Sequence, residues 1–463
     1  MSFSFKTHIK KTLSDTHTPV ELYLKLRDRF PGTFLLESSD YKSKENSFSY
    51  LCASPLASFV VNRETTTVTL PNGNTETTLT EASGVEDTLD SFIKQFETEQ
   101  TDYEFITNGL FGYTSYDAIP LFEDIAFKAP SRDFPLMQYH LFRYLIVFNH
   151  FNNELYLIEH TPDNTPSTLD HLEDIVNQRA ITQFDFNTSK EESSNFTNEA
   201  FLKVIEKGIT HCHLGDVFQV VMSRQFQQQF KGDEFNVYRA LRSINPSPYL
   251  FYFDYGDFKI FGSSPEAQLT IQNREAKINP IAGTFKRTGN AKQDKELAVQ
   301  LSNDPKENAE HNMLVDLARN DLSKNSTQVQ VESLKQIEFY SHVIHLVSKV
   351  SAQLPEKYNA IRILGDTYPA GTLSGAPKHR AMQIIDENEP DNRAFYGGTV
   401  GYIGFHGEFN HAIFIRSLLS YQNTLTYQAG CGVVAKSNPN SELEEVNNKL
   451  SALRNAIALA QKL

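Results

Sequence analysis

The chain has 463 residues, of which 40% are hydrophobic and 12% aromatic, which is enough for one large or two ordinary domains with well-packed cores. The formal net charge is −14, and no basic cluster follows the pattern needed to track a phosphate backbone, so the sequence argues against nucleic-acid binding. The mean hydropathy is −0.41, and neither a membrane span nor an apolar signal segment is found, so a cytoplasmic protein is expected.

The first part of the chain is rich in short strand-like runs separated by helical segments. These runs are TFLLESSDY at 33–41, ASFVVN at 57–62, LFRYLIVF at 141–148 and ELYLIEH at 154–160. The polar segment 187–195 that follows has no apolar anchor, and we predict that it is a linker or surface loop. This divides the chain into an N-terminal region, 1–187, and a C-terminal region, 195–463.

The C-terminal region alternates between helices and strands. Its pattern predicts a helix at about 197–213, a strand at 217–223, a hairpin of 249–255 with 258–262, a helix near 305–318, and a long terminal helix. Over the whole chain the strands outnumber simple βαβ units. We therefore expect an α+β fold with antiparallel sheets rather than a doubly wound fold.

The helix near 305–318 carries two glutamates on one face. Asp304 is placed to cap it, and Pro305 suits the first helical position. Glu307 and Glu310 are three residues apart, so their side chains lie on the same face. Paired carboxylates suit a hard divalent cation such as Mg²⁺, although the same spacing is common on solvated helix faces.

The terminal helix repeats this arrangement. Ser441 and Glu444 form a capping box that predicts where the helix begins. Glu442, Glu445 and Lys449 then fall on a face beside its apolar stripe.

Two glycine-rich runs and one arginine are further candidates. The run 371–378 lacks phosphate-loop spacing and the run 430–432 lacks a dinucleotide fingerprint, so neither ATP nor NAD is indicated. Both runs are either tight turns or sites where backbone N–H groups meet a carboxylate. Arg416 is bounded by apolar residues and requires a carboxylate partner, either from a ligand or from the protein itself.

Ten motifs then occur in the order typical of chorismate-utilising enzymes. They are NPSPYLFYF, GSSPE, NPIAGT, AEHNMLVDLARNDL, YSHVIHLVS, YPAGTLSGAPK, FYGGTVGYIG, IRS, QAGCGVV and ELEEVNNK. From roughly residue 208 to the C-terminus the chain resembles this family, which includes anthranilate synthase component I, aminodeoxychorismate synthase component I, isochorismate synthase and salicylate synthase. The resemblance implies antiparallel sheets forming a sandwich-like core with helices outside, built from interleaved N-terminal and C-terminal segments.

Two positions distinguish between the members. Water-adding members carry a lysine where this chain has Gln219, and a glutamine cannot act as a base for water, so ammonia is the expected nucleophile. Aminodeoxychorismate synthases typically read PIKGT, whereas here the central residue is Ala282. The chain therefore most resembles anthranilate synthase component I, a lyase that converts chorismate and ammonia to anthranilate and pyruvate. Aminodeoxychorismate synthase, an enzyme stopping at aminodeoxyisochorismate, and a non-catalytic tryptophan-sensing homologue remain the alternatives.

The resemblance assigns roles to the candidate residues. Mg²⁺ is expected on Glu310 and Glu445, with Glu307 and Glu442 acting mostly through water. The substrate set comprises Arg416, Tyr396, Gly430, Gly432, Lys449, Ala282, Gly283 and Thr284. His345 is the candidate acid or base, Thr372 lies near the departing group, Gln219 marks the nucleophile's position, and Glu310 is a second candidate proton donor.

The resemblance also implies regulation and a partner. The run ending in Glu37 and Ser38 resembles part of a tryptophan-feedback pocket, and Pro248, Tyr249 and Leu250 resemble its opposite wall, with leucine where the family usually has methionine. No glutaminase motif is found in the sequence. We therefore expect a glutamine amidotransferase subunit to supply ammonia, in a heterotetramer with two copies of each chain.

Overall fold

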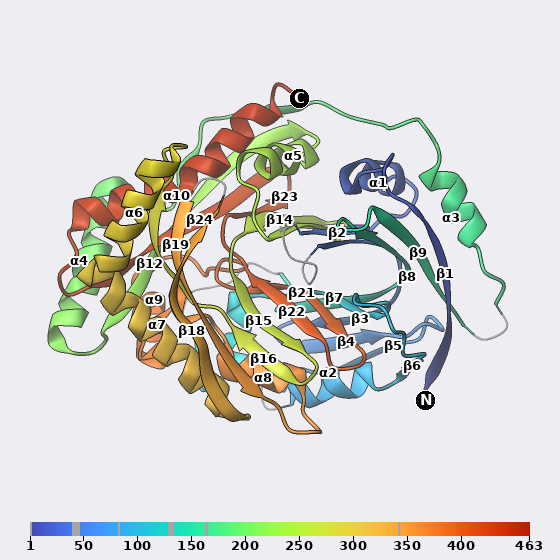
Figure 1. The fold of residues 1–463 in the computed structure, drawn as a ribbon, viewed down its shortest axis with the longest axis horizontal. Coiled ribbons are helices and arrows are strands. Elements are labelled where there is room, and N and C mark those ends of the chain that lie inside the picture. The colour runs from blue at the N-terminus through green and yellow to red at the C-terminus, as the bar shows by residue number, and fades with distance from the viewer. Residues whose placement is uncertain (1, 39–46, 82–83, 128–133, 163–164, 341–342) are drawn as a thin grey trace.

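The structure is a computed structural model that describes residues 2–38, 47–81, 84–127, 134–162, 165–340 and 343–463. Its strands form one continuous network of hydrogen-bonded ladders, with helices packed on the outside (Figure 1). Among the described residues the ladders are antiparallel except for one, which joins β1 (Phe3–Leu13) to β6 (Phe96–Thr98). No helix in the described part of the chain is long and apolar enough to cross a membrane.

Two long strands, β3 (Phe48–Val61) and β8 (Met137–Asn149), pair at the centre, and the sheet extends from them as two arms. The first arm runs from β3 through β2 (Phe34–Glu37), β13 (Tyr249–Asp254), β14 (Phe258–Ser264), β23 (Ser417–Tyr421), β24 (Thr424–Val434) and β12 (Gln219–Gly232). The second arm runs from β8 through β7 (Gly109–Thr114), β21 (Thr399–Gly404), β22 (Phe409–Ile413), β15 (Ala267–Gln272), β16 (Glu275–Ile278) and β19 (Val343–Gln353). Strands β17 (Ile281–Lys286) and β18 (Thr327–Phe339) also pair with β19.

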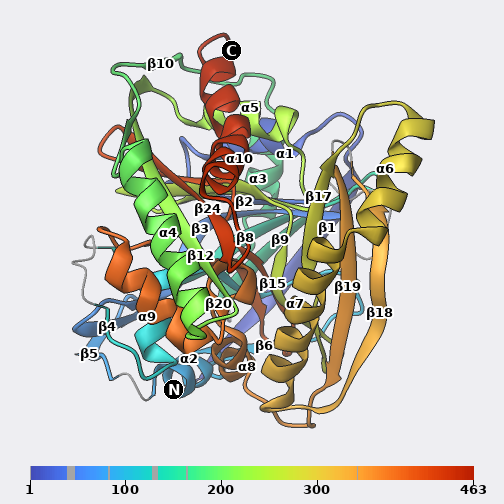
Figure 2. The ribbon, with the colours of Figure 1, turned by 90° about the vertical axis from the view of Figure 1, so that its left-hand side faces the viewer.

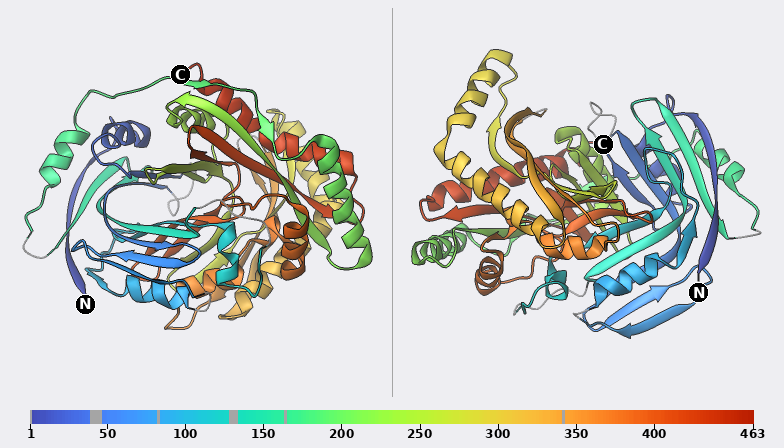
Figure 3. Two further views of the ribbon diagram at one scale, coloured as in Figure 1. Left: turned by 180° about the vertical axis from the view of Figure 1, so that it is seen from behind. Right: turned by 60° about the horizontal axis from the view of Figure 1, so that its bottom comes forward.

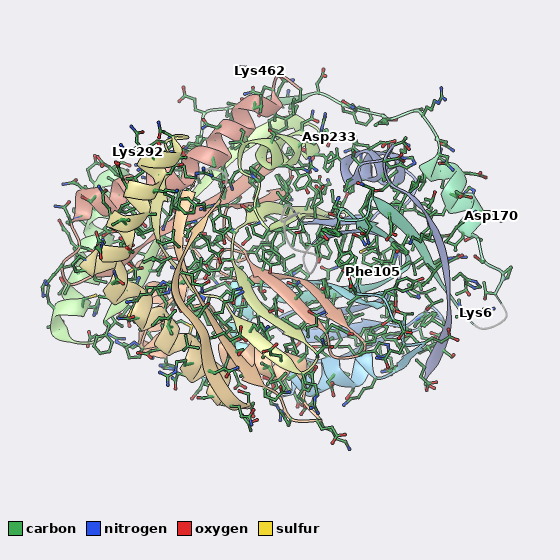
Figure 4. All side chains as sticks on the ribbon, in the orientation of Figure 1. Lys6, Phe105, Asp170, Asp233, Lys292 and Lys462 are labelled. Atoms are coloured by element: carbon green, nitrogen blue, oxygen red, sulfur yellow. The ribbon has the colours of Figure 1, made fainter. Side chains whose placement is uncertain are left out.

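The two arms share an aromatic core. Phe34 and Phe253 of the first arm stack with ring centroids 4.3 Å apart, and they belong to the same buried cluster as Phe111 and Tyr113 of the second arm. Phe105 lies inside the molecule, whereas the labelled lysines lie at its periphery (Figure 4). Two sheet layers around a shared apolar core form the sandwich-like core that the resemblance implies.

Helices cover the outer face of each arm. The first arm packs against α1 (Pro19–Leu26), α4 (Asn198–Leu214), α5 (Phe235–Ile244), α9 (Lys378–Asn388) and α10 (Pro439–Ala460), and α3 (Leu169–Val176) packs on β9 (Glu154–Pro162) and α1. The second arm packs against α2 (Val85–Ile93), α7 (Pro305–Ser323) and α8 (Ala360–Thr367), and α6 (Ala291–Asn303) covers β17 and β19. Figure 2 shows α4 and α10 on one side of the sheet and α6 and α7 beside β17 to β19. The α+β fold class is confirmed.

Segments far apart in sequence share the sheet. Strand β2 pairs with β13 and β7 pairs with β21, so residues before 187 and after 195 build common layers (Figure 3). The predicted linker at 187–195 is wrong in part, because it contributes to two short strands, β10 (Phe186–Thr188) and β11 (Ser193–Ser194). Both pair with the edge of β12, which satisfies backbone groups that the polar sequence alone leaves unassigned.

The two glutamate-bearing helices begin at different kinds of cap. Asp304 caps α7 as predicted, accepting from the backbone N–H of Lys306 at 2.8 Å and of Glu307 at 3.1 Å. The capping box predicted at Ser441 is wrong. Helix α10 begins three residues earlier, where the side chain of Asn438 caps it and Pro439 occupies the first helical position.

Candidate active site

The site centres on the beginning of β12, where Gln219 is buried. Its side-chain amide donates a hydrogen bond to Glu310 Oε1 of α7 at 3.2 Å. Strand β24 runs antiparallel to β12 and places Gly432 opposite Val221. Gln219 therefore links the edge of the first arm to the glutamate face of α7.

Two glycines of β24 are required by close contacts rather than by backbone torsions. A Cβ atom at Gly432 would lie 2.3 Å from Nε2 of Gln219 and 3.7 Å from Oε1 of Glu310. A Cβ atom at Gly430 would lie 3.1 Å from the hydroxyl of Tyr396. The glycine run predicted to bind a substrate thus provides the room in which polar side chains converge.

Four carboxylates approach the site from two helices, Glu307 and Glu310 from α7 and Glu442 and Glu445 from α10. Burial raises the pKa of Glu307, Glu310 and Glu442, and repulsion from neighbouring glutamates adds to the shift in each. A cation would relieve this repulsion. The described residues hold no preformed group of three or more metal-ligating side chains, and Mg²⁺ usually takes one or two carboxylates together with waters and substrate. The donor set fits that ion.

Lys449 ties α10 to β24. Its ammonium pairs with Glu445 at 2.7 Å and donates to the carbonyl oxygen of Gly430 at 2.9 Å. Desolvation lowers the pKa of Lys449, but the opposing effect of the Glu445 carboxylate is part of a larger upward shift. The net pKa of Lys449 is therefore above its ordinary value. Lys449, which the sequence places on the same helix face as Glu445, therefore joins that carboxylate to the glycine run of β24.

His345 is held in one orientation by the strand beside it. Its Nδ1 lies 2.9 Å from the carbonyl oxygen of Gly283 in β17, and a carbonyl can only accept, so Nδ1 carries the proton. Burial lowers the pKa of His345, and the charge of Arg416 lowers it further. The ring is therefore neutral near pH 7, with Nε2 as the basic nitrogen. Tyr340 packs edge-on against the imidazole, with ring centroids 5.4 Å apart.

The adjoining residues of β17 form another part of the wall. Ala282 is buried opposite Leu346 of β19, and a Cβ atom at Gly283 would lie 3.0 Å from a carboxylate oxygen of Glu307. Thr284 pairs with His345 in the backbone ladder, and its side chain lies outside what the structure describes. The stretch 282–284 thus lies between His345 and the glutamate face of α7.

Sequence reasoning missed Glu266, at the end of the GSSPE motif between β14 and β15. Thr372 in the short helix η3 (Gly371–Leu373) donates to its carboxyl group at 3.3 Å. Burial raises the pKa of Glu266 to about 8, against the opposing effects of Thr372, Arg416 and Lys449. This carboxyl group is therefore largely protonated near pH 7. The sequence signal was its place in the motif, because nothing in the local pattern predicts its burial.

Glu266 and Thr372 border a small cavity of about 30 Å³. Its other walls come from α7, β16, β22 and the link between β16 and β17, and they include Leu314, Leu317, Ile278, Ile413 and Pro280. A volume of this size accommodates one or two molecules as small as water. The proton-bearing carboxyl group therefore faces a confined space.

Arg416 lies in the turn between β22 and β23, where its backbone has a positive φ of 51°. Its carbonyl oxygen accepts from the backbone N–H of Ser263 at 3.2 Å, which fixes the turn to the end of β14. Burial lowers the pKa of Arg416, and nearby Glu266 opposes this effect. Glu266 acts on Arg416 only as a nearby acidic group, and because it is largely protonated near pH 7 it does not neutralise the guanidinium.

A buried ion pair supports Tyr396 from behind. Arg393 pairs with Glu389 at 2.6 Å, donates to the carbonyl oxygen of Leu373, and lies 5.6 Å from the ring centroid of Tyr396. Glu389 in turn accepts from the backbone N–H of Ser223 at 2.8 Å. This pair links β12, η3 and the loop carrying Tyr396, so it holds three walls of the site together.

The residues predicted for the feedback pocket meet at a separate place on the first arm. The ladder between β2 and β13 places Glu37 opposite Leu250, with Ser38 and the stretch Pro248–Tyr249 next to them in the chain. Glu37 is buried and accepts hydrogen bonds from Tyr238 at 2.5 Å and Arg242 at 3.0 Å, both on α5. The residues predicted for the feedback pocket therefore bring a buried carboxylate next to apolar side chains.

Known proteins are similar to this chain over most of its length. The family described as chorismate binding enzyme matches residues 12–455. Anthranilate synthase component 1 of Aquifex aeolicus is 36% identical over 97% of this chain and 94% of its own length, and that of Neisseria meningitidis is 37% identical over 98% and 95%.

Two solved structures are also similar. Anthranilate synthase component I from Streptococcus pneumoniae superposes with a TM-score of 0.75 at 31% identity, covering 88% of this chain and 92% of that one. The menaquinone-specific isochorismate synthase of Escherichia coli gives a TM-score of 0.74 at 18% identity, over 98% of this chain and 95% of that one. At that identity the second likeness concerns the fold alone.

Proposed function

Because the chain belongs to the chorismate binding enzyme family, we propose that it is the large subunit of an anthranilate synthase. It converts chorismate and ammonia to anthranilate, pyruvate and water, the first committed chemistry toward tryptophan. The observation that carries the proposal is the buried Gln219 amide against Glu310, with no lysine at this position or at Ala282. Near-full-length relatives at 36–37% identity bear the same activity in their names.

Recognition of chorismate requires positive charge, because the substrate has two carboxylates and the protein is acidic overall. Arg416 and the hydroxyl of Tyr396 would take the carboxylate of the enolpyruvyl arm, together with the backbone N–H groups of Gly430 and Gly432. Glu310 and Glu445, with Glu307 and Glu442 through water, would hold Mg²⁺. When bound, that ion neutralises the ring carboxylate and withdraws electron density from the ring.

The first chemical step adds ammonia at C2 of the ring while the double bond shifts and the C4 hydroxyl leaves as water. A departing hydroxyl needs a proton, and Glu266 is suited to give it because its pKa of about 8 keeps it protonated at neutral pH. Thr372 donates to Glu266 and so orients the carboxyl group. Glu310 is less suited, because its carboxylate accepts from Gln219 and faces other glutamates.

The second step removes the C2 proton and expels pyruvate, which leaves the aromatic ring of anthranilate. His345 is suited to take that proton, because Nδ1–H is held by Gly283 and the basic Nε2 is the nitrogen that remains. A neutral imidazole is required, and the lowered pKa of His345 ensures it. The residues thus divide the work into one acid, Glu266, and one base, His345.

Ammonia itself comes from glutamine in this proposal, through a glutamine amidotransferase partner in a heterotetramer. The buried Glu37 beside Leu250 is suited to bind the ammonium and side chain of tryptophan as a feedback inhibitor. Its carboxylate supplies the negative charge, and Pro248, Tyr249 and Leu250 supply apolar contacts.

The decisive experiment incubates the isolated protein with chorismate, MgCl₂ and ammonium chloride at mildly alkaline pH and resolves the products by mass spectrometry. Anthranilate and pyruvate in equal amounts support the proposal. Aminodeoxychorismate would instead identify the folate-pathway enzyme and contradict the inference from Ala282. Aminodeoxyisochorismate as the end product would contradict the role given to His345, and no turnover would support a non-catalytic homologue.

A further inference from the structure

A carboxylate of the N-terminal region holds the loop that carries Tyr396. Asp117 lies in the short helix η2 (Tyr116–Leu121) and is buried. Its Oδ1 accepts a hydrogen bond from the backbone N–H of Ala394 at 3.2 Å, and its Oδ2 accepts one from the side-chain amide of Asn392 at 3.3 Å. One side chain thus fixes a stretch of chain that ends two residues before Tyr396.

The loop depends on outside support because Ala394 has an unfavourable backbone conformation. Its φ is 51°, in the left-handed region that a residue with a Cβ atom adopts only at a cost in free energy. Its N–H donates to Asp117, and its carbonyl oxygen accepts from the backbone N–H of Tyr116 at 2.8 Å. Both backbone polar groups of Ala394 are therefore bonded to η2, which stabilises a conformation that the loop does not favour by itself.

Packing against Tyr116 restricts the loop on both sides of Tyr396. The guanidinium of Arg393 lies 5.0 Å from the ring centroid of Tyr116 and 5.6 Å from that of Tyr396. Gly397 has a positive φ of 82°, and a Cβ atom there would lie 3.1 Å from the Tyr116 ring. The hydrogen bonds of Asp117 therefore act on a loop that is already in close contact with η2.

The position of the Tyr396 hydroxyl matters because it faces the glycine run of β24. A Cβ atom at Gly430 would lie 3.1 Å from this hydroxyl, so a small shift of the loop would either press it against β24 or draw it away. We propose that Asp117 is a positioning residue for substrate binding, which acts through Ala394 to hold the Tyr396 hydroxyl where a substrate carboxylate is bound. The inference rests on the proposed function, because that function assigns Tyr396 to the carboxylate of the enolpyruvyl arm. Asp117 comes from the N-terminal region, so substrate affinity depends on both halves of the chain.

The hydrogen-bonding atoms around Asp117 allow one conservative replacement. Burial raises the pKa of Asp117 to about 6, while the Asn392 amide and the Ala394 N–H oppose the rise, so both oxygens accept at neutral pH. An asparagine at this position keeps one acceptor for Ala394 and presents an N–H₂ group to Asn392. The Oδ1 of Asn392 is buried and has no hydrogen-bond partner among the described residues, so it can accept from that group once the Asn392 amide turns over. Asp117→Asn should therefore preserve both links, whereas Asp117→Ala removes them.

The test measures kcat and the KM for chorismate, with ammonium chloride and MgCl₂, in Asp117→Ala, Asp117→Asn, Tyr396→Phe and the double variant Asp117→Ala with Tyr396→Phe. We expect Asp117→Ala to raise the KM at least about tenfold with kcat within about threefold, because binding rather than chemistry is weakened. Asp117→Asn should keep the KM within about threefold of wild type. In the Tyr396→Phe background, Asp117→Ala should raise the KM by less than about a further twofold, because the hydroxyl through which it acts is already absent.

The matched control is Asp124→Ala, because Asp124 follows the same short helix and is exposed to solvent, and its KM should equal that of wild type. If Asp117→Ala does not fold, Asn392→Ala removes one of the two hydrogen bonds and takes its place in the same comparison. A wild-type KM in the folded variant, or an equal rise in KM with and without the Tyr396 hydroxyl, would overturn the proposal. Failure of the wild-type chain to make anthranilate from chorismate and ammonium would instead refute the proposed function. Chorismate binding, measured by calorimetry in the same variants, then still tests Asp117, so the two failures are distinguishable.

Discussion

The side-chain amide of Gln219 and the carboxylate of Glu310 lie 3.2 Å apart, in space that exists because residue 432 has no side chain. The hydrogen bond connects the first strand of the site to the glutamate pair of α7. A neutral donor at this position leaves the carboxylate its negative charge. A lysine at this position would instead bring a positive charge to the carboxylate.

The first prediction concerns Gly432→Ala. A Cβ atom there would lie 2.3 Å from the Gln219 amide nitrogen, so the amide must move and its bond to Glu310 is lost. We expect kcat/KM with ammonium to fall at least about tenfold, because misplacement of a reacting group is costly. Steady-state kinetics measure this, and an unchanged thermal unfolding midpoint shows that the fold is intact. Wild-type kcat/KM in the variant would contradict the placement of Gln219.

His345→Ala tests the division of the reaction into two steps. Without a base for the C2 proton, the addition of ammonia proceeds but the expulsion of pyruvate slows by about 10²–10⁴-fold, the usual contribution of such a group. We expect aminodeoxyisochorismate to accumulate, detected by mass spectrometry, while pyruvate release falls. The conservative variant Tyr340→Phe keeps the ring that packs on His345 and serves as the control. Stoichiometric anthranilate from His345→Ala would remove the residue from this role.

The pH dependence of activity follows from the opposite shifts of two groups. A raised pKa of about 8 means that Glu266 donates its proton below pH 8 and loses it above, so activity should fall on the alkaline side of about 8. The lowered pKa of His345 means that its neutral form persists as the pH falls below 6.5, so the acidic limb lies lower than for an ordinary histidine. The measurement is kcat/KM from pH 5 to 10.

Thr372→Val tests whether the alkaline limb belongs to Glu266, because it predicts the direction in which that limb moves. The Thr372 hydroxyl stabilises the charged form of Glu266 by a hydrogen bond and so lowers its pKa. Its removal should therefore move the alkaline limb to higher pH, whereas Glu266→Gln should abolish that limb along with most of the activity. A downward shift in Thr372→Val, or an unchanged alkaline limb in the residual activity of Glu266→Gln, would assign the limb to another group.

The fold and the individual elements followed closely from local pattern. The hairpin of β13 and β14 and the helix α4 lie within two residues of the ranges that the sequence pattern predicts. Asn438 was missed because the capping box at Ser441 is an equally good local signal, although Pro439 already pointed to an earlier start. Local sequence offers two valid helix starts here, and the tertiary fold selects the one that the proline permits.

The site was harder to predict because its chemistry depends on tertiary neighbours. Glu266 sits at a strand end like many solvated glutamates, and only desolvation in the tertiary fold raises its pKa, against the opposing effects of Thr372 and Arg416 from distant segments. The roles of Gly430 and Gly432 were expected to concern their N–H groups. The structure shows a further reason for them, because the Tyr396 hydroxyl and the Gln219 amide lie where their side chains would be.

Glu445→Gln tests the predicted metal site. The substitution removes one of the four carboxylates whose repulsion of one another favours a bound cation. We therefore expect the Mg²⁺ concentration for half-maximal activity to rise at least about tenfold. Titration of Mg²⁺ by calorimetry provides a readout that is independent of turnover. Glu444→Gln is the matched control, because Glu444 directly precedes Glu445 in α10 and is exposed to solvent. Equal Mg²⁺ dependence in the two variants would exclude Glu445 as a ligand.

Glu37→Gln tests the feedback pocket. The buried carboxylate is the only anionic group among the residues predicted for this pocket, so an amide should weaken tryptophan binding at least about tenfold, or roughly 1.4 kcal/mol. The chain contains no tryptophan of its own, so the fluorescence of added tryptophan reports binding directly. Leu250→Met conserves volume and apolarity and should change the affinity by less than about threefold. Equal affinity of wild type and Glu37→Gln would place the effector elsewhere, because loss of the charge must be felt by an ammonium group bound beside it.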